Sequence, residues 1–296
     1  MVEIVVKARR ALMYVPGSDD RKLVKAAGLG IDGVILDLED GVAFNRKDEA
    51  RDGILKALTS IDYGRTERWV RINPIYSGRA EDDLRAVLPG KPDGILIPKA
   101  DHPDTVRKVD ELIAAAVDEQ GWRVGSIAIA LLIENALAFV NLAALCQSSP
   151  RVQALVFGAE DFCADTGVTR TAEARELLYA RSSLVMHASA FGLHAIDMVQ
   201  VNYLDTVLLE KECHDGVELG FTGKTVVHPS QIEIVQRAFT PSPQLIEYAK
   251  QIMEGAAETQ RVGKGVFTHE GKLVDLPVVK RAESILARAR AAGVID

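Results

Sequence analysis

Short apolar runs alternate with longer stretches of helical period along most of the chain. Strands are predicted at residues 11–15, 33–38, 69–73, 94–98, 127–133, 154–157, 195–201 and 224–227. Helices are predicted at residues 19–27, 46–58, 80–88, 103–119, 135–145, 172–191, 205–219 and 231–238. This alternation is typical of repeated βα units around a parallel sheet. Eight units in about 230 residues fit an α/β protein of the (β/α)8 TIM barrel type, and a doubly wound sheet is the competing arrangement.

Charged and polar residues follow nearly every predicted strand and favour the barrel over the doubly wound sheet. They are Asp37, Glu39, Arg71, Asn73, Lys99, Glu134, Asp161 and His228. A barrel places its active site at the carboxyl ends of its strands, so these side chains are expected to converge there.

The pattern changes after Phe239, so we expect a barrel domain, residues 1–239, and a C-terminal helical extension, residues 240–296. In the extension, two helical stretches at 243–260 and 277–291 flank a glycine-rich turn. A lid over an active site, an arm between subunits and a helix pair on the bottom of the barrel all fit this pattern.

The charge balance excludes several classes of partner. The 296 residues include 35 Lys and Arg against 42 Asp and Glu, so neither nucleic acid nor an anionic membrane is an expected partner. The longest apolar stretch, residues 127–146, contains Glu134, Asn135 and Asn141 and is a poor membrane span.

The three cysteines are far apart and odd in number, which fits a reducing compartment. With a short, charged N-terminus unlike a signal peptide, this predicts a cytoplasmic protein.

Asp37 and Glu39 lie on one face of the second predicted strand, because side chains alternate along a strand with a period of two. Two carboxylates about 4 Å apart repel by roughly 4 kcal/mol at an effective dielectric constant near 20. The pair therefore requires a cation, a basic partner or a retained proton. Arg71 and Lys99, at two other strand ends, supply positive charge suited to a carboxylate or a developing enolate oxygen.

Glu134 and Asp161 each end a run that is almost wholly apolar, where a buried charge is costly unless it is paired or bound to a metal. Salt bridges to barrel Lys or Arg residues are one interpretation. Two such acids on neighbouring strands favour a shared cation, and two carboxylates with other positions left for water and substrate are the usual arrangement for Mg²⁺.

Eight segments along the chain carry a more specific signal. They read RRALMYVPGSD, VILDLEDGV, WVRINP, ILIPKA, LLIEN, VFGAEDF, GFTGKTVVHPSQI and LVDLPVVKRA. In this order, from about Arg10 to Arg288, they resemble the citrate lyase β-subunit family of the HpcH/HpaI aldolase superfamily. Within that family they look more like the citramalyl-CoA lyase branch than the citrate lyase β-subunit itself. One departure is Asn135, where the family commonly has Thr after the Glu.

The resemblance implies a TIM barrel that assembles as a trimer or a dimer of trimers, with the C-terminal segment of one subunit covering the active site of its neighbour. It implies that Glu134 and Asp161 bind Mg²⁺ and that Arg71 meets the thioester carbonyl. Asp275 corresponds to the acid that exchanges a proton with the acetyl-CoA methyl group, although from the sequence alone it reads as a helix N-cap. Supporting roles in substrate binding are implied for Arg10, Asp37, Glu39 and Lys99.

The resemblance further implies a reversible retro-Claisen cleavage of a short 3-hydroxyacyl-CoA, with citramalyl-CoA giving acetyl-CoA and pyruvate. A malyl-CoA lyase, or a malate synthase-like enzyme using glyoxylate, is the alternative within the same chemistry. A catalytically idle protein that binds CoA esters is the alternative of another class. The basic residues Arg21, Lys22 and Lys25 are candidates to contact the CoA nucleotide.

Overall fold

A computed structural model of the chain describes residues 7–261, 263 and 265–296. The chain divides into two compact units. One is Arg9–Gln236, and the other includes Arg237–Asp296. The division therefore falls within the helix Ile232–Phe239, whose last residue is the end of the barrel domain predicted from the sequence.

The first unit is built on a closed barrel of eight parallel strands. The strands are β1 (Ala11–Pro16), β2 (Gly33–Asp37), β3 (Glu67–Arg71), β4 (Gly94–Ile97), β5 (Ala128–Ile133), β6 (Val152–Phe157), β7 (His194–Asp197) and β8 (Gly223–Val226). Each strand pairs with the next in the sequence, and β1 pairs with β8, which closes the sheet. The (β/α)8 barrel predicted from the sequence is confirmed, and closure rules out the doubly wound sheet because that sheet has two free edges.

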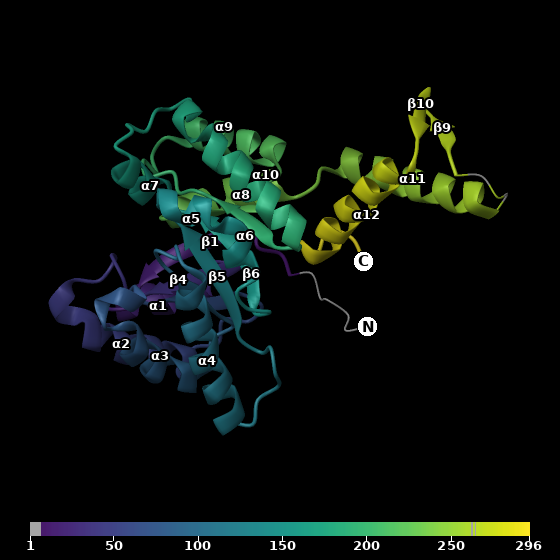
Figure 1. The fold of residues 1–296 in the computed structure, drawn as a ribbon. Helices are drawn as coiled ribbons and strands as arrows, with labels where there is room; N and C mark the ends of the chain where they lie inside the picture. The colour runs from purple at the N-terminus through teal and green to yellow at the C-terminus, as the bar shows by residue number, and fades with distance from the viewer. Residues whose placement is uncertain (1–6, 262, 264) are drawn as a thin grey trace. The chain divides into compact units, whose positions relative to one another are not determined.

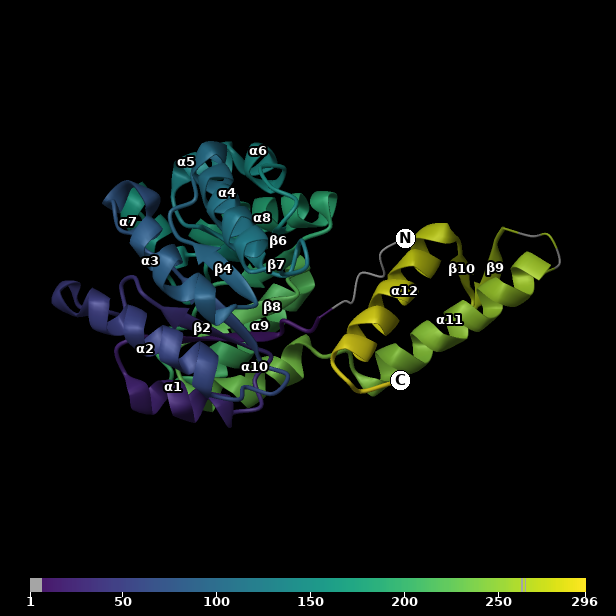
Figure 2. The same cartoon turned by 90° about the horizontal axis from the view of Figure 1, so that it is seen from below.

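Helices surround the strands on the outside of the barrel (Figures 1 and 2). They are α1 (Asp20–Ala27), α2 (Lys47–Ser60), α3 (Ala80–Val87), α4 (Pro103–Glu119), α5 (Ala136–Val140), α6 (Leu142–Cys146), α7 (Ala159–Thr166), α8 (Leu178–Phe191), α9 (Thr206–Leu219) and α10 (Ile232–Phe239). At least one helix follows each strand, and side-chain oxygens of Asp19, Asn135 and Asp205 accept backbone hydrogen bonds at three of the helix starts. Such caps satisfy backbone N–H groups that the first helical turn leaves without partners.

A layer of apolar side chains fills the interior of the barrel and includes Leu12, Ile35, Trp69 and Leu96. Gly94 makes room for Trp69, since a Cβ atom on Gly94 would lie 2.2 Å from the indole ring. Glycine on one strand therefore allows a large aromatic ring from its neighbour to occupy the barrel axis. The filled interior leaves the strand ends as the place for a pocket.

Two helices were predicted as longer than they are. The stretch at 135–145 is two short helices that meet at Asn141, whose side chain donates to the carbonyl of Asp101 at 2.7 Å. The stretch at 172–191 begins with a 3₁₀ turn at Arg175–Leu177 before α8. In the first case a polar side chain bonded to a neighbouring loop marks the break, and the apolar period alone does not reveal it.

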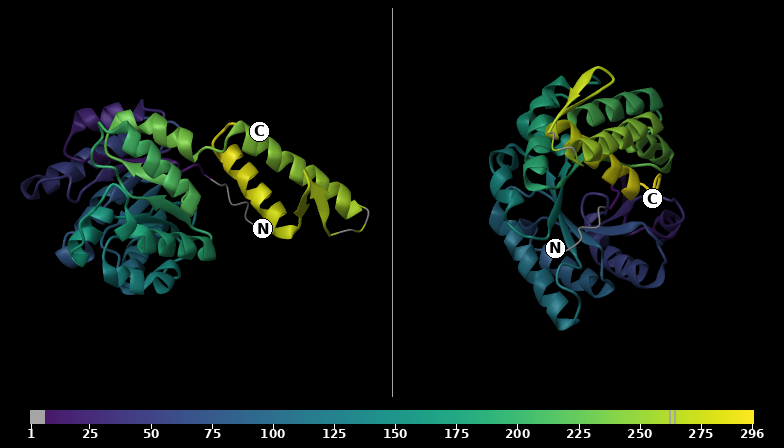
Figure 3. Two further views of the ribbon diagram at one scale, coloured as in Figure 1. Left: turned by 90° about the horizontal axis from the view of Figure 1, so that it is seen from above. Right: turned by 90° about the vertical axis from the view of Figure 1, so that its right-hand side faces the viewer.

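The second unit pairs two long helices, α11 (Pro243–Arg261) and α12 (Leu276–Ala291), with an antiparallel hairpin of β9 (Phe267–His269) and β10 (Lys272–Val274) (Figure 3). It has its own apolar core, which includes Ile246, Ile252 and Ile285. Both helices were expected from the sequence, whereas the hairpin lies in the segment predicted only as a turn. Among the described residues, no helix has the length and apolar character needed to cross a membrane.

Candidate active site

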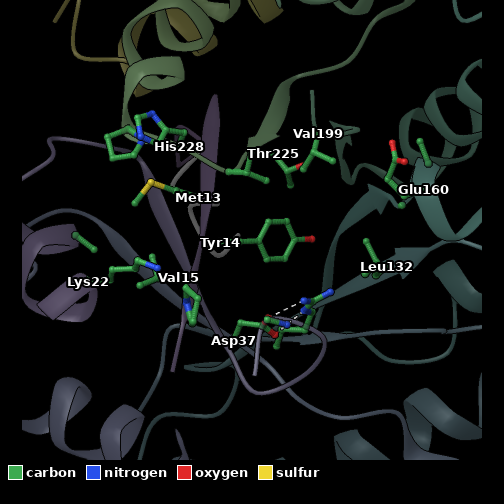
Figure 4. Close-up of a pocket in the computed structure, with 18 of the residues that line it drawn as sticks. Met13, Tyr14, Val15, Lys22, Asp37, Leu132, Glu160, Val199, Thr225 and His228 are labelled. Atoms are coloured by element: carbon green, nitrogen blue, oxygen red, sulfur yellow. Dashed lines mark hydrogen bonds and ion pairs between the residues drawn. The ribbon is translucent and has the colours of Figure 1, made fainter. Parts of the chain in front are cut away.

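A pocket of about 590 Å³ opens at the carboxyl ends of the strands of the first unit. Strand ends from around the barrel contribute to its lining, which includes Tyr14, Asp37, Arg71, Glu134, Asp161, Thr225 and His228 (Figure 4). The candidate residues Asp37, Arg71, Glu134 and Asp161 are thus brought together, as the strand-end argument expects.

Arg71 and Asp37 form a two-pronged ion pair on the wall of the pocket. The Nε and Nη2 atoms of Arg71 donate to Oδ1 and Oδ2 of Asp37, each at 2.7 Å. The backbone N–H groups of Glu39 and Gly41 donate to the same carboxylate. Burial lowers the pKa of Arg71, but the Asp37 carboxylate outweighs that effect and the pKa lies above its ordinary value. Arg71 therefore keeps a fixed positive charge in the pocket wall.

Glu39 lies between two cations. Its Oε2 is 2.8 Å from Nη1 of Arg71, without the geometry of a hydrogen bond, and its Oε1 accepts from Nζ of Lys99 at 3.0 Å. Burial raises the pKa of Glu39, and the Arg71 charge opposes this shift. The repulsion between Asp37 and Glu39 expected from the sequence is thus offset by Arg71 and Lys99, which are the basic partners that the carboxylate pair requires.

Glu134 is held just beyond the end of β5, with 2% of its surface exposed. Its Oε1 accepts a hydrogen bond of 2.7 Å from the backbone N–H of Lys99. Lys99 has a φ of 49°, a left-handed conformation that is uncommon outside glycine, and its side chain reaches Glu39. One residue therefore contacts two carboxylates, by its backbone and by its side chain.

Burial, together with the charges of Glu39 and Asp161, raises the pKa of Glu134 to about 8. Gly158 packs directly against this carboxylate, because a Cβ atom there would lie 2.5 Å from Cβ of Glu134 and 2.7 Å from its Oε2. A buried carboxylate whose charged form is disfavoured is suited to a bound cation, which removes that penalty.

The strand predicted at 154–157 ends where β6 ends, at Phe157, but Asp161, which was interpreted as the end of this apolar run, lies beyond the strand in the first turn of α7. The break is at Gly158, where the chain turns from strand to helix. The Asp161 side chain is 44% exposed, and its Oδ1 is 3.8 Å from Nζ of Lys99. The Asp161 carboxylate therefore lies near the ammonium group of Lys99, as Glu39 does, and remains open to the pocket.

The donor set fits Mg²⁺. Glu134 and Asp161 offer hard oxygen ligands from two carboxylates, one buried and one open to the pocket. Within the described part of the chain, no group of three or more His, Cys, Asp or Glu side chains is placed to hold a metal. A pair of carboxylates suits a cation that keeps several water or substrate oxygens as ligands.

Tyr14 is a pocket residue that the sequence argument missed. It stands in the middle of the pocket in Figure 4, with its hydroxyl group directed toward the side where Leu132 and Glu160 lie. The guanidinium carbon of Arg71 is 4.8 Å from the centre of its ring. Burial raises the pKa of Tyr14 above its ordinary value. The sequence marks Tyr14 only by its position on β1, two residues after the buried Leu12. Side chains two residues apart on a strand point to the same face, which here is the barrel axis.

The structure does not bring Arg10 to the pocket. Arg10 lies before β1, at the opposite end of the barrel from the pocket, and it binds Asp32 through Nε and Nη2 at 2.8 and 2.7 Å. Lys22 and Lys25 of α1 line the pocket, whereas Arg21 lines a separate shallow surface depression. The expected substrate contact from Arg10 is therefore replaced by a structural ion pair.

Asp275 lies in the second unit, as the N-cap of α12. Its Oδ1 accepts from the backbone N–H of Val278 at 3.4 Å, a long capping contact. This is the helix-capping geometry that the sequence alone indicates, and among the described residues the second carboxylate oxygen accepts no hydrogen bond.

Comparisons with known proteins give related sequences and structures over nearly the whole chain. The profile of the HpcH/HpaI aldolase/citrate lyase family matches residues 10–229. The mitochondrial citramalyl-CoA lyase of Homo sapiens is 38% identical over 292 residues, which cover 95% of this chain and 85% of that protein. The (3S)-malyl-CoA thioesterase of Cereibacter sphaeroides is 36% identical and covers 95% of each chain. The crystal structure of protein CitE from Mycobacterium tuberculosis, in complex with magnesium, acetoacetate and coenzyme A, aligns with a TM-score of 0.77 and 32% identity over 96% of this chain and 98% of that one.

Proposed function

The chain belongs to the HpcH/HpaI aldolase/citrate lyase family, and on that premise we propose that it is a Mg²⁺-dependent carbon–carbon lyase that cleaves citramalyl-CoA into acetyl-CoA and pyruvate. The observation that carries the proposal is the placement of buried Glu134 and open Asp161 in one pocket with the fixed charge of Arg71. Citramalyl-CoA is favoured as substrate because the human relative at 38% identity is named for it.

Glu134 and Asp161 would hold the Mg²⁺ ion, as hard oxygen donors on neighbouring segments after β5 and β6. When bound, the ion supplies Lewis acidity that lowers the pKa of the substrate hydroxyl group, which is worth several kcal/mol. Lys99 positions Glu134 through its backbone N–H, and Gly158 leaves space for the carboxylate.

The cleavage breaks the bond between the hydroxyl-bearing carbon and the methylene carbon of the acyl group. The hydroxyl proton passes to solvent as the pyruvate carbonyl forms, and the electrons of the broken carbon–carbon bond move into the enolate of acetyl-CoA. Arg71 stabilises the enolate oxygen, because its positive charge is already fixed by Asp37 before the reaction begins. The enolate carbon then takes up one proton, and we assign that proton to Asp275 as general acid.

Asp275 is proposed to act in the site of a neighbouring subunit, in a homotrimer or a dimer of trimers. The support is the family resemblance of the LVDLP segment. We also propose a cytoplasmic location, since all three cysteines are free. Light scattering coupled to gel filtration tests the oligomer, and a mass equal to one chain contradicts it.

Malyl-CoA is the second candidate substrate, because a relative of 36% identity is named as a malyl-CoA thioesterase. The two substrates differ by one methyl group, a difference worth about 1 to 3 kcal/mol in a pocket. A third proposal, an idle binder of CoA esters, requires neither Mg²⁺ nor exchange of the acetyl-CoA methyl protons.

The test measures pyruvate from citramalyl-CoA and glyoxylate from malyl-CoA, each with Mg²⁺ and with a chelator. Faster Mg²⁺-dependent release of pyruvate is the expected result. Preferential release of glyoxylate makes the chain a malyl-CoA enzyme. Binding of acetyl-CoA without Mg²⁺, with neither cleavage nor methyl-proton exchange, supports the idle binder and contradicts the lyase.

A further inference from the structure

We propose that Arg170 is a positioning residue of the metal site, which holds the first turn of α7 so that Asp161 is directed toward the Mg²⁺ position. The inference rests on the proposed function, since it takes Asp161 as one of the two Mg²⁺ ligands. The contact of Arg170 with this turn is made through Glu160, the residue before Asp161 in the chain.

The first turn of α7 carries two adjacent carboxylates, Glu160 and Asp161, and both line the pocket. Neighbouring residues on a helix point in different directions, so the orientation of the turn decides which of the two acids is presented to the metal. Nη1 of Arg170 forms an ion pair with Oε1 of Glu160. Glu160 is thereby engaged, and Asp161 remains open to the pocket, with its Oδ1 3.8 Å from Nζ of Lys99.

The start of α7 is held without a side-chain cap. Its N-cap residue is Gly158, which has no side chain to accept from the N–H groups of the first turn. A larger residue at this position would meet Glu134, because its Cβ would lie 2.5 Å from Cβ of that residue. The ion pair between Glu160 and Arg170 therefore takes the place of a cap in holding this turn.

Arg170 is also bound to two segments outside α7. Its Nη2 donates to the carbonyl of Val199 at 2.7 Å and to Oε1 of Glu212 at 3.0 Å. Val199 follows β7 and lines the pocket (Figure 4), and Glu212 lies on α9. One guanidinium group, with its planar set of five donors, thus joins the start of α7 to the segment after β7 and to α9.

Glu212 is itself fixed by a buried cation. Its Oε2 accepts from Nζ of Lys224 on β8 at 2.8 Å, and both side chains are buried. Burial lowers the pKa of Arg170, but the carboxylates of Glu212 and Glu160 outweigh this effect, and the pKa lies above its ordinary value. Arg170 therefore stays charged, and a row of alternating charges holds the α7 turn relative to a barrel strand.

The alternative is that Arg170 only stabilises the fold as part of this row of charges. Charge and position predict opposite results for Arg170→Met. Removal of a positive charge near a cation site by itself strengthens Mg²⁺ binding. Loss of the orientation of Asp161 weakens Mg²⁺ binding, because the groups that orient a ligating carboxylate help to set its metal affinity.

Two variants and a matched control separate these roles. Arg170→Met leaves Glu212 paired with Lys224. Arg170→Lys keeps a charge beside Glu212 but loses the planar fork that reaches three acceptors, and it decides the question if the Met variant does not fold. Arg51→Met is the control. The Arg51 side chain is 14% exposed, against 16% for Arg170, and it likewise binds two carboxylates and one carbonyl, outside the pocket.

The experiment measures metal binding to the full chain without substrate. Mn²⁺ is the probe, because it takes the same kinds of oxygen ligand as Mg²⁺ and is detected by electron paramagnetic resonance, and Mg²⁺ is titrated in competition. Arg170→Met and Arg170→Lys are each expected to weaken the binding of both ions about tenfold. Arg51→Met is expected to bind both ions as the wild type does, even where its melting temperature falls as far as that of Arg170→Met.

Wild-type or tighter Mg²⁺ binding in Arg170→Met overturns the inference, because charge then accounts for the effect. Wild-type affinity in Arg170→Lys overturns it as well, and so does an equal loss in Arg51→Met. If the wild type binds the metal but cleaves no citramalyl-CoA, the proposed function fails, and the binding data still decide the role of Arg170. A wild type that binds neither ion contradicts both.

Discussion

A Cβ atom on Gly158 would lie 2.7 Å from Oε2 of Glu134. At that distance a methyl group and a carboxylate overlap, so one of them must move. Gly158, where the chain passes from β6 into α7, thus also limits the space available to the buried carboxylate of Glu134 just beyond β5.

Gly158→Ala is therefore expected to displace Glu134 and to raise the Mg²⁺ concentration needed for half-maximal activity at least tenfold. Metal titration of the activity, with the melting temperature measured alongside, checks this. Gly28→Ala is the matched control, because its Cβ would meet only the carbonyl of Lys25, at 3.8 Å. An unchanged Mg²⁺ requirement in Gly158→Ala would show that Glu134 is not a ligand.

Asp275→Asn separates the proposed role of Asp275 as a general acid from its role as the N-cap of α12. Asn caps a helix about as well as Asp, so α12 is expected to keep its stability. The amide does not donate a proton as a carboxylic acid does, and we expect turnover and deuterium exchange of the acetyl-CoA methyl group to fall at least 100-fold. Asp19→Asn, which changes another N-cap, should leave both rates intact. Normal methyl exchange in Asp275→Asn would remove this residue from the reaction.

The pair Arg181 and Asp197 is expected to be a large contributor to stability. Nη2 of Arg181 is 2.6 Å from Oδ2 of Asp197, and the two side chains are 4% and 0% exposed. Arg181→Met leaves a buried carboxylate without its partner and should lower the free energy of unfolding by about 3 to 5 kcal/mol. Replacing Asp197 with Leu as well should recover most of this loss. Urea unfolding of the single and double variants measures both effects.

Lys211→Met is the control for that series. Lys211 and Asp215 form an exposed pair at 2.7 Å, so its loss should cost less than about 1 kcal/mol. If Arg181→Met costs no more than this control, the buried pair does not stabilise the fold as described.

His194 should make stability depend on pH. Burial, with a smaller contribution from Arg9, lowers the pKa of His194 to about 4. The unfolded chain binds the proton more tightly, so stability is complete above about pH 6.5 and falls as the pH drops toward 4. His194→Gln should flatten the melting temperature over that range, whereas His214→Gln, which alters an exposed residue, should not. Equal pH profiles for wild type and His194→Gln would refute the assignment.

The barrel could be predicted from the sequence because each strand is a compact apolar run followed by a polar residue. Glu134, Arg71 and Lys99 were identified on this basis, and the structure places each at a strand end. The end of β6 was predicted as well, but the helix that begins after Gly158 and carries Asp161 was not, since the run ALVFGAED shows no sign of a helix start. Glycine after an apolar run is equally compatible with a turn and with a helix start, and tertiary packing decides between them.

Contacts between residues far apart in the sequence could not be predicted in the same way. Arg10 was expected at the site from the family resemblance, yet its partner Asp32 lies at the other end of the barrel from the pocket. Tyr14 reads as one more apolar strand residue, and its position in the pocket is visible only when β1 lies beside β2 and Arg71 stacks on its ring. Register and barrel closure determine both, and neither leaves a local signal.

The second unit holds its two helices together with an apolar core of its own, so its internal structure does not depend on the barrel that carries it. The second unit of one copy of the chain can therefore contact the barrel of another copy without any loss of packing inside the unit. If Asp275 serves a neighbour, two defective proteins should restore each other: Glu134→Gln and Asp275→Asn, each inactive alone, should form mixed oligomers with partial activity after dissociation and reassembly. Activity that stays at zero in the mixture would mean that each copy uses its own Asp275. If activity is restored instead, two defective alleles of this single gene should complement each other in a cell.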